Sequence, residues 1–222
     1  MVKASGRLVK ITINSYNRSA DNYAAFRSSL GPVRLFLEFF CANLKGKKVL
    51  DIGCGHGRDA KYLKAQGLEV TGIDLSEKLL KIARKNVPGV DFQLMDMRGL
   101  KFKENTFDGL WVNTSFLHLP RVDAERVLAE FHRVLKPGGL MLLSVQGSPN
   151  ELGKVVEEIG PKEKLIATEQ LGWDNPRLFT YYDADELRKL LKKARFDVIR
   201  VVTKKEEISK ILWINTFSIA RK

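Results

Sequence analysis

The stretch from Lys47 to Gln146 alternates short apolar runs with amphipathic segments whose apolar residues recur at helical spacing. Alternation of this kind is typical of a parallel sheet with helices on both faces. The apolar runs predict strands at residues 47–52, 68–73, 90–95, 107–113 and 139–146. The amphipathic segments predict helices at residues 58–66, 76–86 and 122–135, and Pro137 with the glycines after it ends the last of these.

The pattern differs on both sides of this core. An apolar helix is predicted at residues 33–41, and the more polar piece before it contains Tyr16 and Tyr23. Residues 147–182 break the rhythm as a long insertion, whose aromatic residues argue against disorder. After it, Asp183 caps a predicted helix. Two final strands are predicted at residues 196–203 and 211–219. An exposed hairpin is predicted between them at residues 204–210.

The most informative motif is VLDIGCGHGRD at residues 49–59. An apolar run ends in Asp51, and glycines follow at the alternate positions 53, 55 and 57. Glycine allows positive φ and has no Cβ, so the motif predicts a buried strand, a turn where a ligand contacts backbone, and a helix. The next strand ends at Asp74, whose carboxylate suits the two hydroxyls of a ribose. This order of elements predicts half of a nucleoside-cofactor site.

A nicotinamide cofactor fits this turn poorly. Its fingerprint, G-x-G-x-x-G, requires a third glycine where this chain has Arg58. Asp51 would also repel a diphosphate at the helix N-terminus, whereas it would attract an ammonium group. S-adenosylmethionine has an ammonium, a sulfonium and an adenosine, and no phosphate. Two structural interpretations stay open: a glycine turn without a ligand, and Asp74 as a charge before the helix that Ser76 caps.

Five motifs in order resemble those of the class I S-adenosylmethionine-dependent methyltransferases that act on small molecules. They lie within roughly residues 16–220 and read VLDIGCGHGRDAKYL, VTGIDLSEKLLKIARKN, VDFQLMDMRGLKF, FDGLWVNTSFLHLP and HRVLKPGGLMLLSV. The resemblance implies an α/β fold with a doubly wound, mostly parallel seven-stranded sheet whose last strand is antiparallel. It implies S-adenosylmethionine as the cofactor. We expect one domain with a helical cover (1–45), a cofactor-binding core (46–146), a substrate-side insertion (147–182), and a C-terminal helix with two strands (183–222).

The resemblance also implies a cofactor site that runs from the glycine turn to the fourth strand. Asp74 takes the ribose, Asp96 accepts from the adenine amine, and the Met97 N–H serves a ring nitrogen. A plain turn is the alternative for Asp96. The other cofactor residues expected are Asp51, Gly53, Cys54, Gly55, His56, Gly57, Leu75 and Asn113. Cys54 is more typical of a small packing residue than of a nucleophile, and His56 is expected to shield the cofactor.

Methyl transfer from a sulfonium mainly requires alignment of the acceptor and exclusion of water, with a base only where the acceptor must lose a proton. His118 is the first candidate for that base because imidazole titrates near neutrality, and Tyr181 is the second. A structural or cofactor-contacting role is the alternative for His118. The expected substrate contacts are Tyr16, Tyr23, Ser115, His118, Trp173, Tyr181 and Tyr182. We expect the N-terminal segment and the insertion to close together over the methyl group.

The charge leaves the class of acceptor open. The net charge is +12, and residues 1–48 contain nine basic and two acidic side chains. Such a surface is compatible with nucleic acid, an acidic substrate or a membrane surface, and equally with a plain solvated basic surface. However, the sequence Asn-Thr-Ser-Phe at 113–116 replaces the proline-proline-aromatic motif common in enzymes that methylate exocyclic amines of nucleic acids. A small-molecule methyltransferase is the leading interpretation. The alternatives are an RNA or protein methyltransferase that uses the basic N-terminal face, and a nucleoside-binding protein without catalysis.

Cysteine and histidine usage narrows the setting. The two cysteines and three dispersed histidines form neither a disulfide framework nor a metal-binding pattern. No stretch has the length of a signal peptide's apolar region or of a membrane span of ~20 residues. We therefore expect no metal, no membrane association and a cytoplasmic location. The sequence does not predict the oligomeric state.

Overall fold

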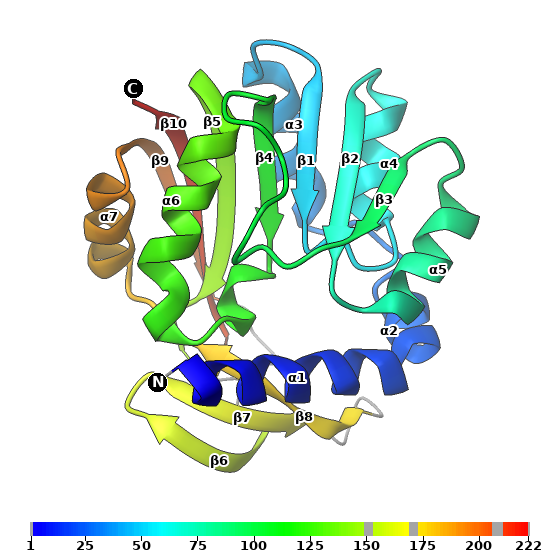
Figure 1. The fold of residues 1–222 in the computed structure, drawn as a ribbon, viewed down its shortest axis with the longest axis vertical. Helices are drawn as coiled ribbons and strands as arrows, with labels where there is room; N and C mark the ends of the chain where they lie inside the picture. The colour runs from blue at the N-terminus through cyan, green and yellow to red at the C-terminus, as the bar shows by residue number, and fades with distance from the viewer. Residues whose placement is uncertain (1, 149–152, 169–172, 206–210, 222) are drawn as a thin grey trace.

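The computed structural model describes residues 2–148, 153–168, 173–205 and 211–221, and its main feature is a seven-stranded sheet (Figure 1). The strand order is β3-β2-β1-β4-β5-β10-β9. The strands are β1 (Lys48–Ile52), β2 (Glu69–Asp74), β3 (Asp91–Leu94), β4 (Phe107–Asn113), β5 (Leu135–Gln146), β9 (Phe196–Lys205) and β10 (Leu212–Ala220). The first five strands in this order, β3, β2, β1, β4 and β5, are parallel to one another. Strand β10 is antiparallel to both of its neighbours, β5 and β9. The predicted doubly wound, mostly parallel sheet with an antiparallel last strand is therefore confirmed.

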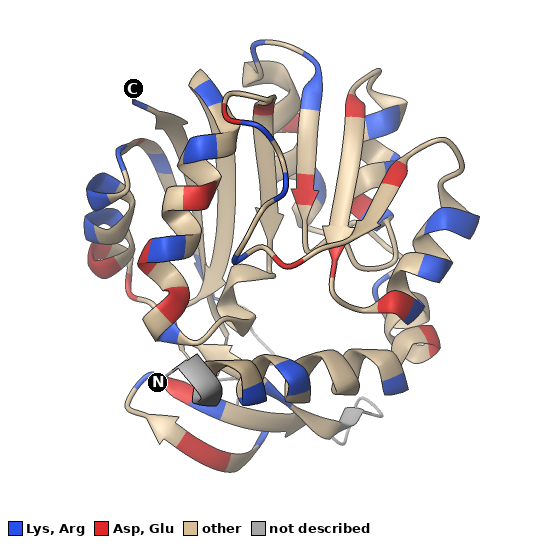
Figure 2. Ribbon diagram, viewed as in Figure 1, with Lys and Arg blue, Asp and Glu red and all other residues tan. Residues whose placement is uncertain are grey.

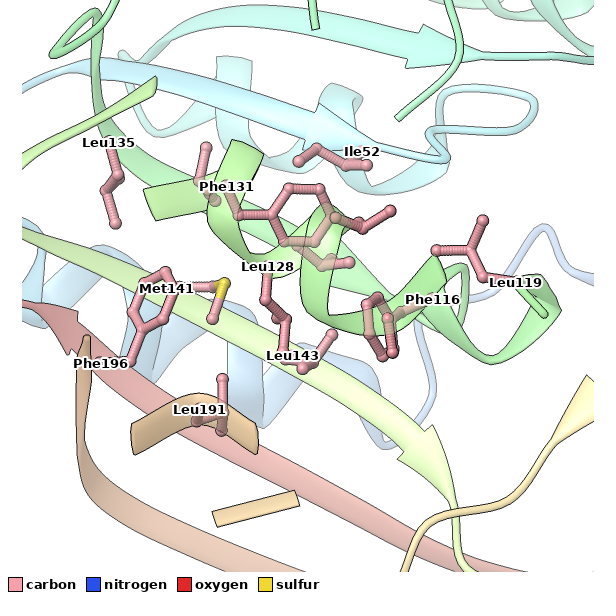
Figure 3. Packing of buried hydrophobic residues seen from close by; sticks show 14 of the residues in the cluster. Ile52, Phe116, Leu119, Leu128, Phe131, Leu135, Met141, Leu143, Leu191 and Phe196 are labelled. Atoms are coloured by element: carbon pink, nitrogen blue, oxygen red, sulfur yellow. The ribbon is translucent and has the colours of Figure 1, made fainter. Parts of the chain in front are cut away.

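Helices cover both faces of this sheet because successive strand residues point to opposite sides. One face packs against α3 (Val33–Asn43), α4 (Arg58–Ala65) and α5 (Glu77–Asn86). The other packs against α6 (Ala124–Val134) and α7 (Ala184–Lys193). Figure 3 shows part of the second cluster, where Leu128 and Phe131 of α6 pack among Ile52, Met141 and Leu143.

Small differences from the predicted boundaries occur around α6. Two single-turn 3₁₀ helices, η1 (Phe116–His118) and η2 (Arg121–Asp123), precede it, so the α-helix begins at Ala124 rather than at residue 122. Strand β5 begins at Leu135, where a strand was expected only from residue 139. The register between β4 and β5 is irregular here, and Gly138 has φ of 71°. Pro137 and the glycines therefore shift the register of the strand instead of forming a loop before it.

The N-terminal segment forms two helices, α1 (Val2–Arg18) and α2 (Ala20–Phe26). Ser5, Leu8, Thr12 and Ser15 are buried and recur at helical spacing, which fixes the face that α1 turns inward. In Figure 1, α1 crosses below the carboxyl ends of the central strands.

The insertion contains a second sheet that the sequence did not predict. Its three antiparallel strands are β6 (Lys154–Gly160), β7 (Glu163–Thr168) and β8 (Trp173–Thr180). This sheet packs beneath α1 (Figure 1), and the Thr12 hydroxyl accepts a hydrogen bond from the Leu178 N–H at 2.9 Å. Leu8, Leu165 and Leu178 form a small apolar core between them. Helix α1 is therefore held between the two sheets.

Three remaining expectations concern the hairpin after β9, the two cysteines and a possible membrane span. The hairpin predicted at 204–210 lies mostly outside the described residues, which end in β9 at Lys205 and resume at Ile211. Cys41 and Cys54 are both free thiols. Among the helices that the structure describes, none has the length and apolar character of a membrane span.

Candidate functional site

The glycine turn joins β1 to α4 as the sequence predicts. Gly53, Gly55 and Gly57 all have positive φ, at 73°, 54° and 83°. The Gly53 N–H donates to the Ile73 carbonyl at 2.8 Å, which ties the turn to the end of β2. A Cβ on Gly53 would collide with the Ser115 side chain. Glycine is required here both by the backbone conformation and by the close approach of the loop after β4.

A cavity of about 980 Å³, counting the part open to solvent, lies between this turn and α1. It lies at the carboxyl ends of β1, β2 and β4, where open α/β sheets bind ligands. The residues predicted for the cofactor that line it are Asp51, Gly53, Cys54, Gly55, His56, Asp74, Leu75, Asp96, Met97 and Asn113. Gly57 lies behind the turn, where an added Cβ would come within 3.2 Å of Ala83 and Phe92.

Two carboxylates at the floor of the cavity, those of Asp59 and Asp51, differ in their hydrogen-bond partners and in the direction of their pKa shifts. Asp59 is buried, pairs with Arg58 at 2.7 Å, and accepts from Trp111 Nε1 and Asn113 Nδ2 at 2.9 Å each. Although burial opposes its ionisation, the Arg58 guanidinium and these hydrogen bonds lower the pKa of Asp59. Asp51 is only 2% exposed, and its Oδ2 has no hydrogen-bond partner among the residues that the structure describes. Burial, together with the nearby Asp59 carboxylate, raises the pKa of Asp51 well above its usual range.

Asp74 is fixed in position by the backbone around it. Its Oδ2 accepts from the Gly55 N–H at 2.9 Å, and its Oδ1 accepts from the Ser76 N–H at 2.8 Å. Burial raises the pKa of Asp74, and these backbone hydrogen bonds oppose that rise. Ser76 caps α5 through its own hydroxyl, which accepts from the Leu79 N–H at 3.3 Å. Asp74 is therefore not needed to cap α5. This weakens the alternative interpretation in which Asp74 serves only as a charge before that helix.

Asp96 lines the cavity but already has a partner. Its Oδ2 lies 2.6 Å from Arg98 Nη2, and its Oδ1 accepts from the Arg98 N–H at 2.9 Å. Arg98 donates four hydrogen bonds to this carboxylate, two to each oxygen, so an adenine amine would have to replace or share one of them. Figure 2 shows acidic residues at the carboxyl end of β2 and in the loop after β3, both on the side of α1.

His118 and the aromatic side chains of the N-terminal helices form the opposite wall. His118 Nδ1 is 2.6 Å from the Leu178 carbonyl, which can only accept, so Nδ1 has the proton and Nε2 accepts from the Tyr16 hydroxyl at 2.8 Å. Burial lowers the pKa of His118 to about 4 and raises that of Tyr16. Tyr16 packs edge-to-face against Tyr23 at 5.1 Å, and Tyr23 likewise against His56 at 5.9 Å.

The predicted substrate residues fall into two groups. Tyr16, Tyr23, Ser115 and His118 line the cavity, and the Ser115 hydroxyl donates to the Ile52 carbonyl at 2.6 Å. Tyr181 and Tyr182, which follow β8, are not among its lining residues, and the side chain of Trp173, at the start of β8, lies outside what the structure describes. Tyr182 is fully buried against Phe116, with a ring separation of 5.7 Å, and the Tyr181 hydroxyl is buried without a partner.

Several lining residues were not predicted. Val9, Thr12 and Ile13 line the cavity from α1, and Arg58 and Asp59 line its floor. The buried spacing along α1 is visible in the sequence, but the face of the sheet that α1 covers is not. Thr114 also lines the cavity and has φ of 57°, an uncommon conformation for a β-branched residue.

Comparison with known proteins identifies the family. A methyltransferase domain family matches residues 49–139. The methyltransferase GfsG of Streptomyces halstedii is 35% identical over 123 residues, which are 51% of this chain and 44% of that protein. A malonyl-[acyl-carrier protein] O-methyltransferase of Hamiltonella defensa is 28% identical over 84% of this chain and 72% of that protein. Residues 49–139 therefore belong to the methyltransferase family that the five motifs predict. The whole chain spans about half the length of most curated relatives that it matches.

The fold of this methyltransferase also matches solved structures. The Burkholderia thailandensis 1,6-didemethyltoxoflavin-N1-methyltransferase, with its bound 1,6-didemethyltoxoflavin and S-adenosylhomocysteine, aligns with a TM-score of 0.76. The alignment covers 98% of this chain and 91% of that chain at 22% identity, so it supports the fold alone. The predicted family and fold are thus confirmed, and so is the cofactor type that the family implies.

The residues of the cavity fit S-adenosylmethionine. The unpartnered Oδ2 of buried Asp51 is an acceptor without a donor, which an ammonium group would supply. The positive-φ turn leaves the backbone of Gly53 and Gly55 open to close approach by a ligand. Four carboxylates line the cavity, from Asp51, Asp59, Asp74 and Asp96, and they suit a cofactor with two positive groups.

Proposed function

We propose that this methyltransferase transfers a methyl group from S-adenosylmethionine to a small-molecule acceptor. The observation that carries the proposal is the buried Asp51 carboxylate, which has an unpartnered oxygen facing an acid-lined cavity at the glycine turn. Bound there, the cofactor supplies an activated methyl on a sulfonium. Asp51 would hold the ammonium, Asp74 the ribose, and Asp96 with Met97 the adenine.

The chain's own part in the reaction is mainly alignment and exclusion of water. The cavity is covered on the side of α1 by Val9, Thr12, Ile13 and Tyr16. Helix α1 is held from the other side by β8, through the Thr12 hydrogen bond to Leu178 and the Ser15 hydrogen bond to the Asn175 carbonyl at 2.8 Å. A cover of this kind restricts the acceptor's size, which supports a small molecule over a polymer.

His118 and Tyr16 would act on the acceptor as a pair. A neutral His118 has its free lone pair on Nε2, directed at the Tyr16 hydroxyl. An acceptor hydroxyl or amine that replaced or joined the Tyr16 hydroxyl at Nε2 would be oriented by it. Because burial keeps the pKa of His118 near 4, the pair is better suited to orienting an acceptor than to holding a proton at neutral pH. Tyr181 has no contact with the cavity that would support the catalytic role predicted for it.

The names of two similar proteins favour a small acceptor group. The Burkholderia thailandensis protein is named for 1,6-didemethyltoxoflavin, a small molecule, and the Hamiltonella defensa protein for a malonyl group carried on acyl carrier protein. Family membership favours an enzyme over the non-catalytic nucleoside-binding protein considered from the sequence. A cytoplasmic location remains our inference from the two free thiols.

Calorimetry and a labelling experiment test this function together. S-adenosylmethionine and S-adenosylhomocysteine should bind and NAD⁺ should not. Asp51→Asn should weaken both cofactors, whereas Asp91→Asn, an exposed change at the start of β3, should not. With S-adenosylmethionine tritiated on its methyl group, label should enter the small-molecule filtrate of a cell extract rather than its RNA or protein. Failure of the wild type to bind S-adenosylhomocysteine would refute the proposal.

The basic N-terminal segment keeps an RNA or protein acceptor as the second candidate. Two of its arginines are already paired, Arg7 with Glu157 and Arg34 with Glu38, each at 2.9 Å. RNA binding through the remaining charges would weaken steeply as salt is raised, because each neutralised phosphate releases counterions. We expect only weak, non-specific RNA binding in a salt series followed by fluorescence anisotropy. Tight, sequence-selective binding at physiological salt would favour the RNA alternative instead.

A further inference from the structure

A second cavity adjoins the cofactor cavity on the side of α3. Its volume is about 760 Å³, counting the part open to solvent, which is within the usual range for a small-molecule site. The sequence did not predict it, because its walls come from segments far apart along the chain. Four residues line both cavities: Tyr23, Arg58, Asn113 and Thr114. A molecule in the second cavity would therefore reach the cofactor cavity at the end of β4.

The sheet supplies a polar wall. Ser144 of β5 pairs with Asn113 of β4 and with Asn215 of β10, so these three side chains lie on one face at one level of the sheet. Trp213, two residues before Asn215, lies on the same face and pairs with Lys204 of β9. The wall thus extends from a row of neutral polar groups at the cofactor end to an indole and an ammonium at the far end.

The opposite wall is largely apolar. It is formed by Pro32, Val33 and Phe36, at the start of α3. No acidic residue lies in the first turn of this helix. The N-terminal end of a helix favours negative charge, so the same wall that offers apolar contact adds a small positive potential.

The two cavities differ most clearly in the charge of the residues that line them. The second cavity is lined by Arg27, Arg58 and Lys204 and by no Asp or Glu, whereas four aspartates line the first. Arg58 is neutralised by its pair with Asp59. Arg27 and Lys204 have no ion-pair partner among the described residues, and the Arg27 guanidinium lies 6.0 Å from the Phe26 ring. Within the described part of the chain, two positive charges therefore face this cavity without a carboxylate to balance them.

We propose that the second cavity binds the methyl acceptor, and that the acceptor is an amphipathic anion. Its carboxylate or phosphate group would pair with Arg27 and Lys204, and its apolar body would lie between Phe36 and Trp213. The anion is the recognition group, and the end of the acceptor that receives the methyl would extend past Thr114, which lines both cavities, into the first cavity, where Tyr16 and His118 lie. This inference rests on the proposed methyl transfer, since it assigns the other substrate of the same site.

Matched pairs of charged and uncharged probes test the assignment. Indole-3-acetate with indole-3-acetamide, and phenyl phosphate with phenol, are titrated by calorimetry into protein saturated with S-adenosylhomocysteine. At least one anion should bind roughly tenfold more tightly than its uncharged counterpart, since hydrogen bonds to charged groups are the stronger class. Comparing the affinity gain in the carboxylate pair with that in the phosphate pair shows which of the two anionic groups the cavity prefers.

Three variants test whether the preference for the anion comes from Arg27 and Lys204. Arg27→Gln and Lys204→Gln should each weaken the preferred anion roughly tenfold and leave the uncharged probes within about twofold. Lys205→Gln is the matched control, because it removes the same charge from the next residue of β9, which points to the other face of the sheet. Equal losses for Lys204→Gln and Lys205→Gln would mean that the anion responds only to overall charge, and the inference would be wrong.

The titration of S-adenosylhomocysteine itself separates this inference from the proposed function. If S-adenosylhomocysteine binds the wild type and both variants normally, but neither anion is preferred over its uncharged counterpart, the anionic acceptor is refuted and methyl transfer stands. If S-adenosylhomocysteine does not bind the wild type, the proposed function fails first.

Discussion

Acidification should destabilise the folded methyltransferase through one side chain, His118. Its ring lies between the Leu178 carbonyl, to which Nδ1 donates, and the Tyr16 hydroxyl, which donates to Nε2. A proton on Nε2 would face the hydrogen of that hydroxyl and would charge a ring held in a low-dielectric wall. The folded protein therefore resists a proton that the unfolded chain binds readily.

The pKa of His118 sets the size and the sign of the effect. It is 6.5 for an unperturbed histidine and about 4 in the folded protein. Below about pH 6.5 the unfolded state binds more protons, so the free energy of unfolding falls with falling pH and levels off near pH 4. The linkage relation gives a loss of at most about 2 kcal/mol between about pH 7 and about pH 5 from this group.

Urea denaturation of the cofactor-free protein at these two pH values measures the loss. Other groups also titrate, so the loss is compared between the wild type, His118→Gln and His132→Gln. His132 is the control because it lies on α6, where its Nε2 meets the Arg221 carbonyl at 2.8 Å, away from the cavity. The wild type and His132→Gln should lose up to about 2 kcal/mol more than His118→Gln.

Parallel losses in the wild type and His118→Gln would refute the reasoning. A direct check does not depend on the variant's stability: the ring resonances of His118 in the wild type should not titrate between about pH 5 and about pH 8. A midpoint near 6.5 would show that the ring is solvated and free of Tyr16, and would restore His118 as a candidate base at neutral pH.

Four further outcomes are expected. Asp51→Asn should lower the affinity for S-adenosylhomocysteine by roughly 10- to 100-fold in calorimetry, and the wild-type affinity should rise with pH because Asp51 must ionise to pair with the ammonium; a pH-independent wild type would contradict this. Asp74→Ala should cost several kcal/mol of cofactor affinity at about 1.5–3 per charge-assisted bond, and an unchanged affinity would remove it from the site. Asp96→Asn, which keeps an acceptor oxygen, should be tolerated better than Asp96→Leu; equal tolerance would place the residue outside the adenine pocket. Cofactor binding should increase hydrogen-exchange protection in α1 and in β8, and protection confined to the glycine turn would argue against a lid.

The core of the fold was predictable because its signals are local. The central strands β1, β4 and β5 are mostly buried on both faces, so they read as apolar runs, and each covering helix reads as an amphipathic segment. The small sheet β6–β8 was not predictable in the same way. Strand β6 contains no buried residue, and the sheet packs against α1, which lies more than a hundred residues away in the sequence.

The sequence by itself determined the cofactor half of the site. Gly53 to Asp59 are adjacent in the chain, and the turn conformation that they require follows from glycine alone. Asp51 and Asp74 reach the same cavity because they end neighbouring parallel strands, which the strand–helix alternation already implies.

Only the tertiary structure decided the acceptor half. It placed Tyr16 against His118, 102 residues away, where the buried ring accepts a hydrogen bond from the Tyr16 hydroxyl. It took Tyr182 into the core against Phe116 and left Tyr181 outside the cavity. Burial, pKa and the side to which a ring points depend on which distant segments pack together, and no short stretch of sequence contains that information.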